Sequence, residues 1–215
     1  MNQNQTNQNN NQSTNQSPKP KYIIIDTEAT GLFFAKNGLI QVGSMILDKN
    51  LNVIDQYCQD IQPPQSKEIN QEALDVNGFD RQRIAGGISY REFCEQFLVF
   101  IKKYFGDYKP IVVAQFWAFD YAFLNQVFFE VGLEEEFGQL LGNDFVDTKS
   151  LVNFANLRAD INNQPLPFPI TSLSKKGGLK DILGLNSDNY QSHDALGDCL
   201  ATRDVLLKLA RIITL

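Results

Sequence analysis

Residues 22–31 read Tyr-Ile-Ile-Ile-Asp-Thr-Glu-Ala-Thr-Gly, a β-branched run followed by two acids and a glycine. A continuous apolar run of this kind is typical of a strand that is buried on both faces of a sheet. Because residues i and i+2 of an extended chain project to the same side, Asp26 and Glu28 can face one site. We expect the strand to end at Asp26 and the chain to turn at Gly31. This leaves both acids at the carboxyl end of the strand, where open α/β sheets bind ligands.

Patterns downstream of this stretch predict a layered α/β domain. Two further strands, at about residues 39–47 and 53–61, form a meander with the first. Ser192 is the expected N-cap of the last helix. A meander followed by strand–helix alternation indicates a mixed sheet flanked by helices. The other expected elements are helices at 71–76 and 90–104, a strand at 111–114, a helix that Asp120 opens, a strand at 145–146, a helix from 148, irregular chain at 162–170, and helices at 179–183 and 194–212.

The composition is that of a globular domain in a reducing compartment. The chain has 215 residues, of which 43% are hydrophobic and 20% are charged, and this length suffices for one domain with a sizeable core. No apolar run approaches the length that spans a bilayer, and the N-terminus lacks the apolar core of a signal peptide. Three widely spaced cysteines fit neither a disulfide framework nor a zinc site, and we expect all three to be buried or half-buried. These features indicate an intracellular protein, cytoplasmic or nuclear, that is neither secreted nor bound to a membrane.

The N-terminal segment differs from the rest of the chain. Residues 1–17 contain 12 Asn or Gln and no large apolar residue after Met1, so they cannot bury a core. We therefore expect a disordered Asn/Gln-rich tail at residues 1–20 and one domain at residues 21–215. The formal net charge of −6 argues against avid, sequence-independent binding of duplex nucleic acid, which depends on clustered Lys and Arg.

Two more acids and a single histidine complete a candidate catalytic set. Asp120 follows the strand at 111–114, at a position where a carboxylate is also a common helix N-cap. His193 is the only histidine and stands five residues before Asp198. Five residues turn a helix by about 140° net, so we place Asp198 on the last helix and His193 at its start, within reach of a water molecule. A lone histidine is more often a surface or core residue, so the histidine by itself does not establish chemistry.

Four carboxylates and one histidine are sufficient for phosphodiester hydrolysis. Hard oxygen ligands suit Mg²⁺ or Mn²⁺, and two-metal sites hold their ions about 4 Å apart. Histidine titrates in the range that a general base requires. The residue types therefore indicate a two-metal site that cleaves a phosphodiester bond.

Three segments resemble the motifs of the DEDDh, or DnaQ-like, 3′–5′ exonucleases of the ribonuclease H-like superfamily. Their order and spacing fit that family, and the resemblance covers about residues 21–210. Between the motifs, residues 76–78 resemble a loop that meets the terminal nucleotide, and residues 146–148 resemble a structural turn. The three segments are Asp26-Thr27-Glu28-Ala29-Thr30-Gly31, Phe119-Asp120-Tyr121-Ala122-Phe123-Leu124 and His193-Asp194-Ala195-Leu196-Gly197-Asp198.

The resemblance implies a ribonuclease H-like fold with an exonuclease active site. Two Mg²⁺ ions, for which Mn²⁺ could substitute, would be bound by Asp26, Glu28, Asp120 and Asp198, and His193 would be the general base. The implied reaction is hydrolysis at single-stranded 3′ ends of DNA or RNA, with release of nucleoside 5′-monophosphates. A polymerase or another replication or RNA-processing protein would be a partner. The implied substrate contacts are Thr27, Thr30, Gly31, Val76, Asn77 and Phe119.

Two departures from the family pattern bear on substrate preference. The second motif often reads His-Asn-Ala-x-Phe-Asp, whereas this chain has Gln115 and Phe116 at the first two positions. In the nucleotide-facing loop, Asn77 replaces a frequent histidine. Neither change removes an expected metal ligand.

Aromatic and basic side chains near the motifs have two interpretations each. The aromatic rings could stack on bases or pack in the core, and core packing is favoured for Phe119. The lysines before the third motif could hold the phosphate backbone or form a solvated surface. The rings are those of Phe33, Phe34, Trp117 and Phe119, and the lysines are Lys175, Lys176 and Lys180.

Three alternative functions remain open. They are a dedicated RNA-trimming exoribonuclease, a catalytically silent exonuclease-fold module that binds nucleic acid or a polymerase, and a sugar- or nucleotide-binding α/β protein. The five catalytic positions argue against the silent module, and three ordered motifs argue against the third alternative. The sequence does not distinguish DNA from RNA as the substrate, because this discrimination depends on one or two contacts to the 2′ position. It does not indicate the oligomeric state either.

Overall fold

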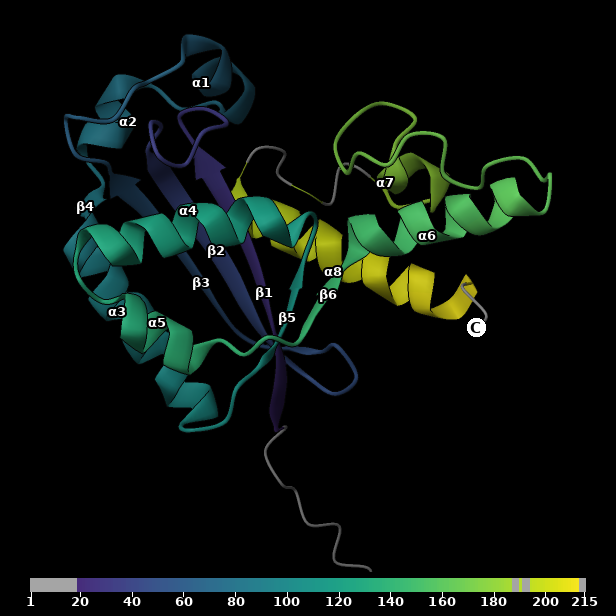
Figure 1. Ribbon diagram of the computed structural model, residues 1–215, viewed down its shortest axis with the longest axis horizontal. Coiled ribbons are helices and arrows are strands. Elements are labelled where there is room, and N and C mark those ends of the chain that lie inside the picture. The colour runs from purple at the N-terminus through teal and green to yellow at the C-terminus, as the bar shows by residue number, and fades with distance from the viewer. Residues whose placement is uncertain (1–18, 187–189, 191–193, 213–215) are drawn as a thin grey trace, which may run out of the picture.

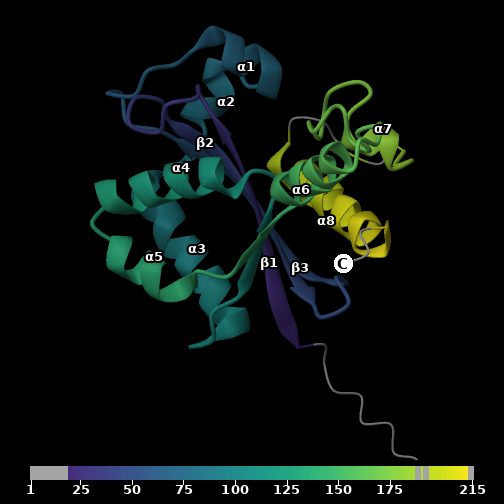
Figure 2. The ribbon, with the colours of Figure 1, turned by 45° about the vertical axis from the view of Figure 1, so that its right-hand side comes forward.

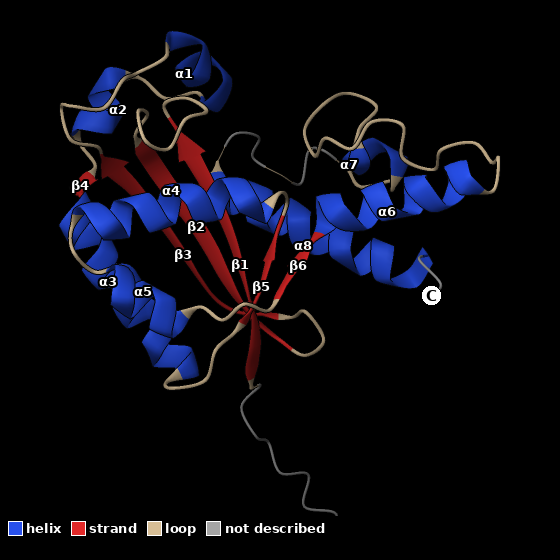
Figure 3. Ribbon diagram, viewed as in Figure 1, coloured by secondary structure: helices blue, strands red, loops and turns tan. Residues whose placement is uncertain are grey.

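The computed structural model describes residues 19–186, 190 and 194–212. In this part of the chain a six-stranded sheet of order β4-β3-β2-β1-β5-β6 has helices on both faces (Figures 1 and 3). The strands are β1 (Pro20–Ala29), β2 (Leu39–Asp48), β3 (Val53–Gln62), β4 (Ile88–Ser89), β5 (Ile111–Ala114) and β6 (Phe145–Asp147). The helices are α1 (Gln71–Asn77), α2 (Arg81–Ala85), α3 (Tyr90–Phe105), α4 (Trp117–Glu130), α5 (Glu134–Leu140), α6 (Thr148–Ile161), α7 (Leu179–Ile182) and α8 (Ala195–Ile212).

β1 joins the antiparallel and parallel parts of the sheet. It pairs antiparallel with β2 and parallel with β5, while β2–β3 is antiparallel and β3–β4 and β5–β6 are parallel. The predicted mixed sheet flanked by helices is therefore confirmed. The prediction that the strand ends at Asp26 is wrong, because Asp26 pairs with Gly43, Glu28 pairs with Gln41, and the strand continues to Ala29. The long neighbouring strand extends the ladder beyond the β-branched run.

Alternate residues of β1 face two different helical layers. Ile23 and Ile25 pack in the larger core with aromatic side chains of α3, α4 and α5, whereas Ile24 packs on the opposite face with Cys199 of α8. The three isoleucines have no exposed surface, which confirms a strand buried on both faces. Figures 1 and 2 show α3, α4 and α5 on one side of the sheet and α6 and α8 on the other.

Short elements account for most differences from the expected boundaries. The prediction misses α2, α5 and β4, which have 5, 7 and 2 residues. α2 and β4 are too short to show a clear hydrophobic period, and α5 opens with three consecutive glutamates and has only two large apolar residues. α4 begins at Trp117 rather than at Asp120, and α8 begins at Ala195, one residue later than expected. Ser192, the expected N-cap of α8, lies outside the described residues.

The remaining expectations concern cysteines, the membrane and the tail. Cys94 and Cys199 are buried as expected, but Cys58 is exposed. Its Sγ lies 3.9 Å from Asp194 Oδ1, beside the residue that precedes α8, so the helix itself does not cover it. Within the described ranges, no helix combines the length and the apolar character needed to cross a membrane. Residues 1–18 lie outside the described part, so the disordered tail stays a prediction.

Candidate active site

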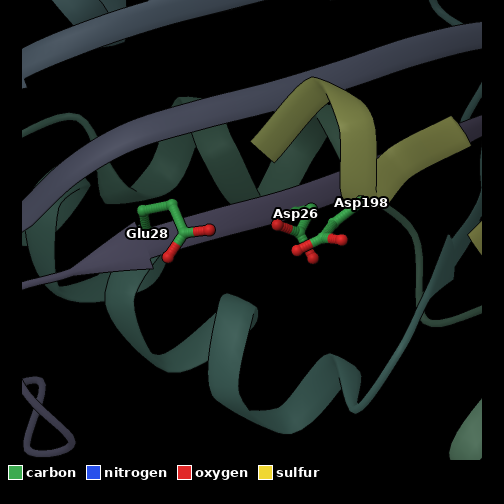
Figure 4. Close-up of side chains that lie close together, drawn as sticks. All are labelled: Asp26, Glu28 and Asp198. Atoms are coloured by element: carbon green, nitrogen blue, oxygen red, sulfur yellow. The ribbon is translucent and has the colours of Figure 1, made fainter. Parts of the chain in front are cut away.

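Alternation along β1 brings two carboxylates to the face that α8 covers. Because Ile24 faces α8, residues 26 and 28 follow on the same side, and α8 adds Asp198 from its first turn. Carboxylate oxygens of Asp26, Glu28 and Asp198 all lie within 4.8 Å of one another. Figure 4 shows Asp26 and Asp198 side by side, with the Glu28 carboxylate directed toward them. The fold thus brings together three of the four carboxylates expected to bind metal.

Burial and mutual repulsion raise the pKa values in this cluster. Burial is the largest cause of a pKa for Asp26 well above its usual range, and the charges of Asp120 and Asp198 raise it further. Burial also raises the pKa of Glu28 to about 8, with Asp198 and Asp120 adding to the shift. Partly buried like charges are costly unless a cation compensates them. A divalent cation would offset both effects, and carboxylate oxygens are the ligands that Mg²⁺ and Mn²⁺ prefer, so these residues fit such an ion.

Asp120 approaches the site from the opposite helical layer. Thr27 points to the α4 side of β1, and its Oγ1 donates a 2.7 Å hydrogen bond to Asp120 Oδ1. Burial raises the pKa of Asp120 to about 7, although the hydrogen bond from Thr27 acts in the opposite direction. The alternative that Asp120 caps its helix is wrong, since α4 begins three residues earlier and its N-cap is Phe116. In the described part of the chain, the group of three mutually close carboxylates does not include Asp120.

Buried polar contacts fix the start of α8 against β2. The Ala195 N–H donates to Gln41 Oε1 at 2.8 Å, and Gln41 Nε2 donates to Asp60 Oδ1 at 2.8 Å. Gly43 permits the close approach of the helix, because a Cβ there would lie 2.4 Å from the Ala195 carbonyl carbon. Sequence reasoning missed both β2 residues. Their only signal is the register of the sheet, which pairs them with the two acids of β1.

His193, the expected general base, lies outside the described residues. The next residue, Asp194, is described, and its charge contributes to the raised pKa values of Asp26 and Glu28. The chain that immediately follows His193 is therefore close to the carboxylate cluster.

A groove of about 540 Å³ is lined by Asp26 and Asp198 together with two lysines, Lys149 and Lys175. Lys175 is one of the lysines considered from the sequence, whereas Lys149 is not. Lys149 directly follows the turn at residues 146–148, and its proximity to the acids depends on the pairing of β6 with β5. Cations beside an acidic cluster suit a polyanionic chain, since the lysines can face phosphates while the acids hold metal.

Three of the expected substrate contacts already interact with other parts of the protein. Thr30 Oγ1 donates to a backbone carbonyl at 2.6 Å and accepts from a backbone N–H at 2.8 Å. Asn77 is buried, and its Nδ2 donates to the Ala29 carbonyl at 2.9 Å. A Cβ at Gly31 would lie 2.5 Å from the side chain of Asn37. These residues shape the loops that follow β1.

The other candidate contacts divide by exposure. Val76, Phe33 and Phe34 are exposed and accessible to a ligand. Phe119 is half-buried, and its ring centroid lies 4.9 Å from that of another α4 phenylalanine, in agreement with the core-packing interpretation. Trp117 is buried.

The three lysines before the third motif have separate environments. Lys175 lines the groove and Lys176 is exposed. Lys180 is buried, with Nζ 5.6 Å from the centroid of the Tyr190 ring. The prediction of a surface position is therefore wrong for Lys180, because α7 packs that side chain against Tyr190.

Comparison with known proteins agrees with the fold and the motifs. A family model described as an exonuclease, RNase_T, matches residues 23–206. The chain belongs to the DEDDh, or DnaQ-like, exonuclease family. The family resemblance and the ribonuclease H-like fold inferred from the motifs are thus confirmed. No curated protein matches this exonuclease-family chain in sequence.

Solved exonuclease structures share the fold at low sequence identity. Escherichia coli exonuclease I in complex with a dT13 oligonucleotide aligns with a TM-score of 0.66 and 18% identity, covering 89% of this chain and 41% of that one. Exonuclease I from Methylocaldum szegediense gives a TM-score of 0.66 at 18% identity, covering 88% of this chain and 40% of that one. The nuclease domain of 3′hExo, a DEDDh family member bound to rAMP, gives 0.67 at 16%, covering 88% and 91%. The chain therefore spans less than half of the exonuclease I chains and nearly all of the 3′hExo nuclease domain.

Proposed function

We propose that this protein is a divalent-metal-dependent 3′–5′ exonuclease that hydrolyses phosphodiester bonds at single-stranded 3′ ends and releases nucleoside 5′-monophosphates. The observation that carries the proposal is the convergence of Asp26, Glu28 and Asp198 within 4.8 Å. The convergence occurs in a chain of the exonuclease family. An acidic cluster with raised pKa values and neighbouring lysines is suited to bind metal and a phosphate chain together.

Each acid has a role that its place in the fold supports. Asp26, Glu28 and Asp198 would hold two Mg²⁺ ions, or Mn²⁺ in their place, with Asp120 as the fourth carboxylate. The bound ions would polarise the phosphoryl oxygens and lower the pKa of water. Thr27 orients the Asp120 carboxylate through its hydrogen bond. The fold joins residues of both helical layers at one strand, so small shifts of either layer would misalign the ligands.

His193 is proposed as the general base. It takes a proton from the attacking water and returns it to solvent, a role that a pKa near neutrality permits. The hydrogen bond between the Ala195 N–H and Gln41 supports this assignment, because it anchors the chain two residues after the histidine. Asp194, adjacent to the histidine, already influences the pKa of Asp26.

The substrate is a single strand whose 3′ end reaches the acids along the groove. Lys149 and Lys175 line that groove and supply positive charge for phosphates. Proteins of similar structure bind DNA or RNA. Exonuclease I is solved in complex with dT13, and a 3′-exonuclease of the same fold is described as recognising the 3′ end of a histone mRNA stem-loop. We propose DNA or RNA 3′ ends as the substrate class, with a polymerase or RNA-processing protein as a partner.

Degradation of matched single-stranded DNA and RNA by the purified protein tests the proposal. Each oligonucleotide carries a 5′ label, so 3′–5′ hydrolysis gives a ladder of shortened labelled products. We expect activity with Mg²⁺ or Mn²⁺, none after exhaustive chelation and none with Ca²⁺ alone. Asp198→Asn serves as the control for contaminating nucleases. Full activity in chelator, or labelled mononucleotide as the first product, would overturn the proposal, and activity on RNA alone would restrict it to an exoribonuclease.

A further inference from the structure

A second hollow, of about 570 Å³, lies next to the catalytic groove and has a floor and rim of aromatic rings. Trp117 and Phe137 are buried and form its base, whereas Tyr121 and Phe145 are 46% and 55% exposed. The Trp117 and Tyr121 ring centroids are 5.7 Å apart. These residues come from α4, α5 and β6, on the side of the groove away from α8.

The hollow and the groove share a wall. Phe116 and Lys149 line both of them, while Asp26 and Asp198 line only the groove. Lys149 Nζ lies 4.3 Å from the centroid of the Phe116 ring. A nucleic-acid strand that enters the groove can therefore continue over Phe116 and Lys149 into the aromatic hollow while it stays in contact with the protein surface.

Phe116 adopts a backbone conformation that bulky residues rarely take. Its φ is +77°, in the left-handed region, and its N–H donates to Asp147 Oδ1 at 3.0 Å. A conformation of this kind is strained for a non-glycine residue and persists where the surroundings impose it, often at ligand sites. The residue is 46% exposed, so nearly half of its surface is open to a ligand. The strained backbone holds an aromatic face at the wall between the two spaces.

We propose that the hollow binds an unpaired nucleobase of the strand whose 3′ end lies at the carboxylates, an inference that rests on the proposed function. Aromatic rings bind single-stranded bases by stacking, and every base has a face for this contact. Lys149, at the shared wall, faces the phosphate that joins the base in the hollow to the nucleotides in the groove. Asn143 and Asn153 also line the hollow and offer donors and acceptors to the edge of a base.

The single tryptophan makes occupancy measurable. Trp117 is the only tryptophan in the chain and lines the hollow, so its emission reports on that place alone. The experiment titrates the full-length protein in Ca²⁺ with a set of single-stranded oligonucleotides. One abasic site is moved through the six nucleotides nearest the 3′ end, and both tryptophan quenching and the dissociation constant are recorded.

We expect the intact strand to quench Trp117 emission. An abasic site at one or two internal positions should remove the quenching and raise the dissociation constant at least about fivefold, the effect of one lost base–aromatic stack. In the double variant Tyr121→Ala/Phe145→Ala, the intact strand should bind as weakly as that abasic strand, with no further loss when the base is removed. Phe129 lies on α4 outside the hollow and is 62% exposed. Phe129→Ala is therefore the control for loss of an exposed ring and should keep the wild-type profile.

The outcomes separate this inference from the proposed function. If no abasic position affects quenching, or if the double variant keeps the wild-type profile, the hollow does not bind a base and the inference is overturned. Melting curves of both variants verify that they are folded. If the abasic profile behaves as expected but no hydrolysis occurs in Mg²⁺, the base site stands and the exonuclease proposal fails.

Discussion

The two faces of β1 have different roles. On the α4 side, Ile23 and Ile25 pack into a core rich in phenylalanine. On the α8 side, Ile24 packs on Cys199, and the strand then presents Asp26 and Glu28 to Asp198. One face therefore supplies much of the burial that stabilises the domain, and the other holds a cluster of repelling charges.

This difference indicates where stability and activity reside. A partly buried acidic cluster is unfavourable in the folded metal-free protein, so apolar burial elsewhere, including the phenylalanine-rich core on the α4 side, offsets its cost. The hydrogen bond from Thr27 to Asp120 links the two layers. If the comparison is correct, substitutions of the clustered carboxylates should lower activity without lowering stability. Substitutions in the phenylalanine-rich core should lower stability without lowering the rate per folded molecule.

Asp198→Ala should have the largest effect, lowering turnover by about a thousandfold or more through the lost charge stabilisation by metal. Its melting temperature should stay equal or rise, because one repelling charge is removed from the cluster. Initial hydrolysis rates and thermal melts measure the two effects, and Asp204→Asn, on the same helix but outside the cluster, serves as control. Retention of more than about a tenth of the wild-type rate would show that Asp198 is not a metal ligand.

His193→Ala should slow turnover by about 10²–10⁴-fold, the usual contribution of a general base. Substrate binding and melting temperature should change little. His193→Gln keeps a polar group but cannot carry the proton, so it should be nearly as slow. Rates measured from pH 5 to 9 should rise through a group near neutrality in the wild type, and near wild-type turnover in either variant would refute the assignment.

Phe128→Ala tests the opposite face. The side chain has no exposed surface and stacks on Phe137 with 4.4 Å between ring centroids, so we expect a loss of about 3–5 kcal/mol in the free energy of unfolding. Phe129→Ala, the exposed neighbour, should change stability by less than about 0.5 kcal/mol. Urea denaturation gives both values. The rate per folded molecule should remain close to that of the wild type, and a selective loss of rate at unchanged stability would break the comparison.

Gln41→Leu should reduce the turnover number about tenfold and leave KM nearly unchanged. The change removes the acceptor for the Ala195 N–H, and an unpaired buried donor costs about 1–3 kcal/mol, which loosens the start of α8. Gln56→Leu, at an exposed position of β3, is the matched control. Equal losses in the two variants would mean that the Gln41 contact does not position α8.

The last prediction concerns the pH dependence of stability in the metal-free protein. The pKa of Glu28 is about 8 in the folded protein against an ordinary value of 4.5, so the folded state binds more protons than the unfolded state between these values. Stability in chelator should therefore fall as pH rises from about 5 to 8. Melting temperatures across this range measure the slope, and Glu28→Gln should flatten it. A melting temperature that rises with pH would contradict the raised pKa.

Much of the architecture was predictable because it depends on local patterns. The β-branched run and the helical spacing of residues 90–104 gave correct elements, and β5 has the predicted bounds. α2 and β4 have too few residues to show a period, and α5 has only two large apolar residues among seven. The start of α4 was also misplaced, since its N-cap Phe116 makes no side-chain capping contact and gives no capping signal.

The sequence by itself determined the order of the motifs, the mixed α/β fold and the pair of acids on one side of β1, since alternation along a strand is a local property. Only the tertiary structure decided that Asp120 meets Thr27 from the opposite layer, that Gln41 holds α8, and that Lys149 reaches the groove. These contacts join residues far apart in the chain. They depend on the register of β1 with β2 and β5, which no local pattern specifies.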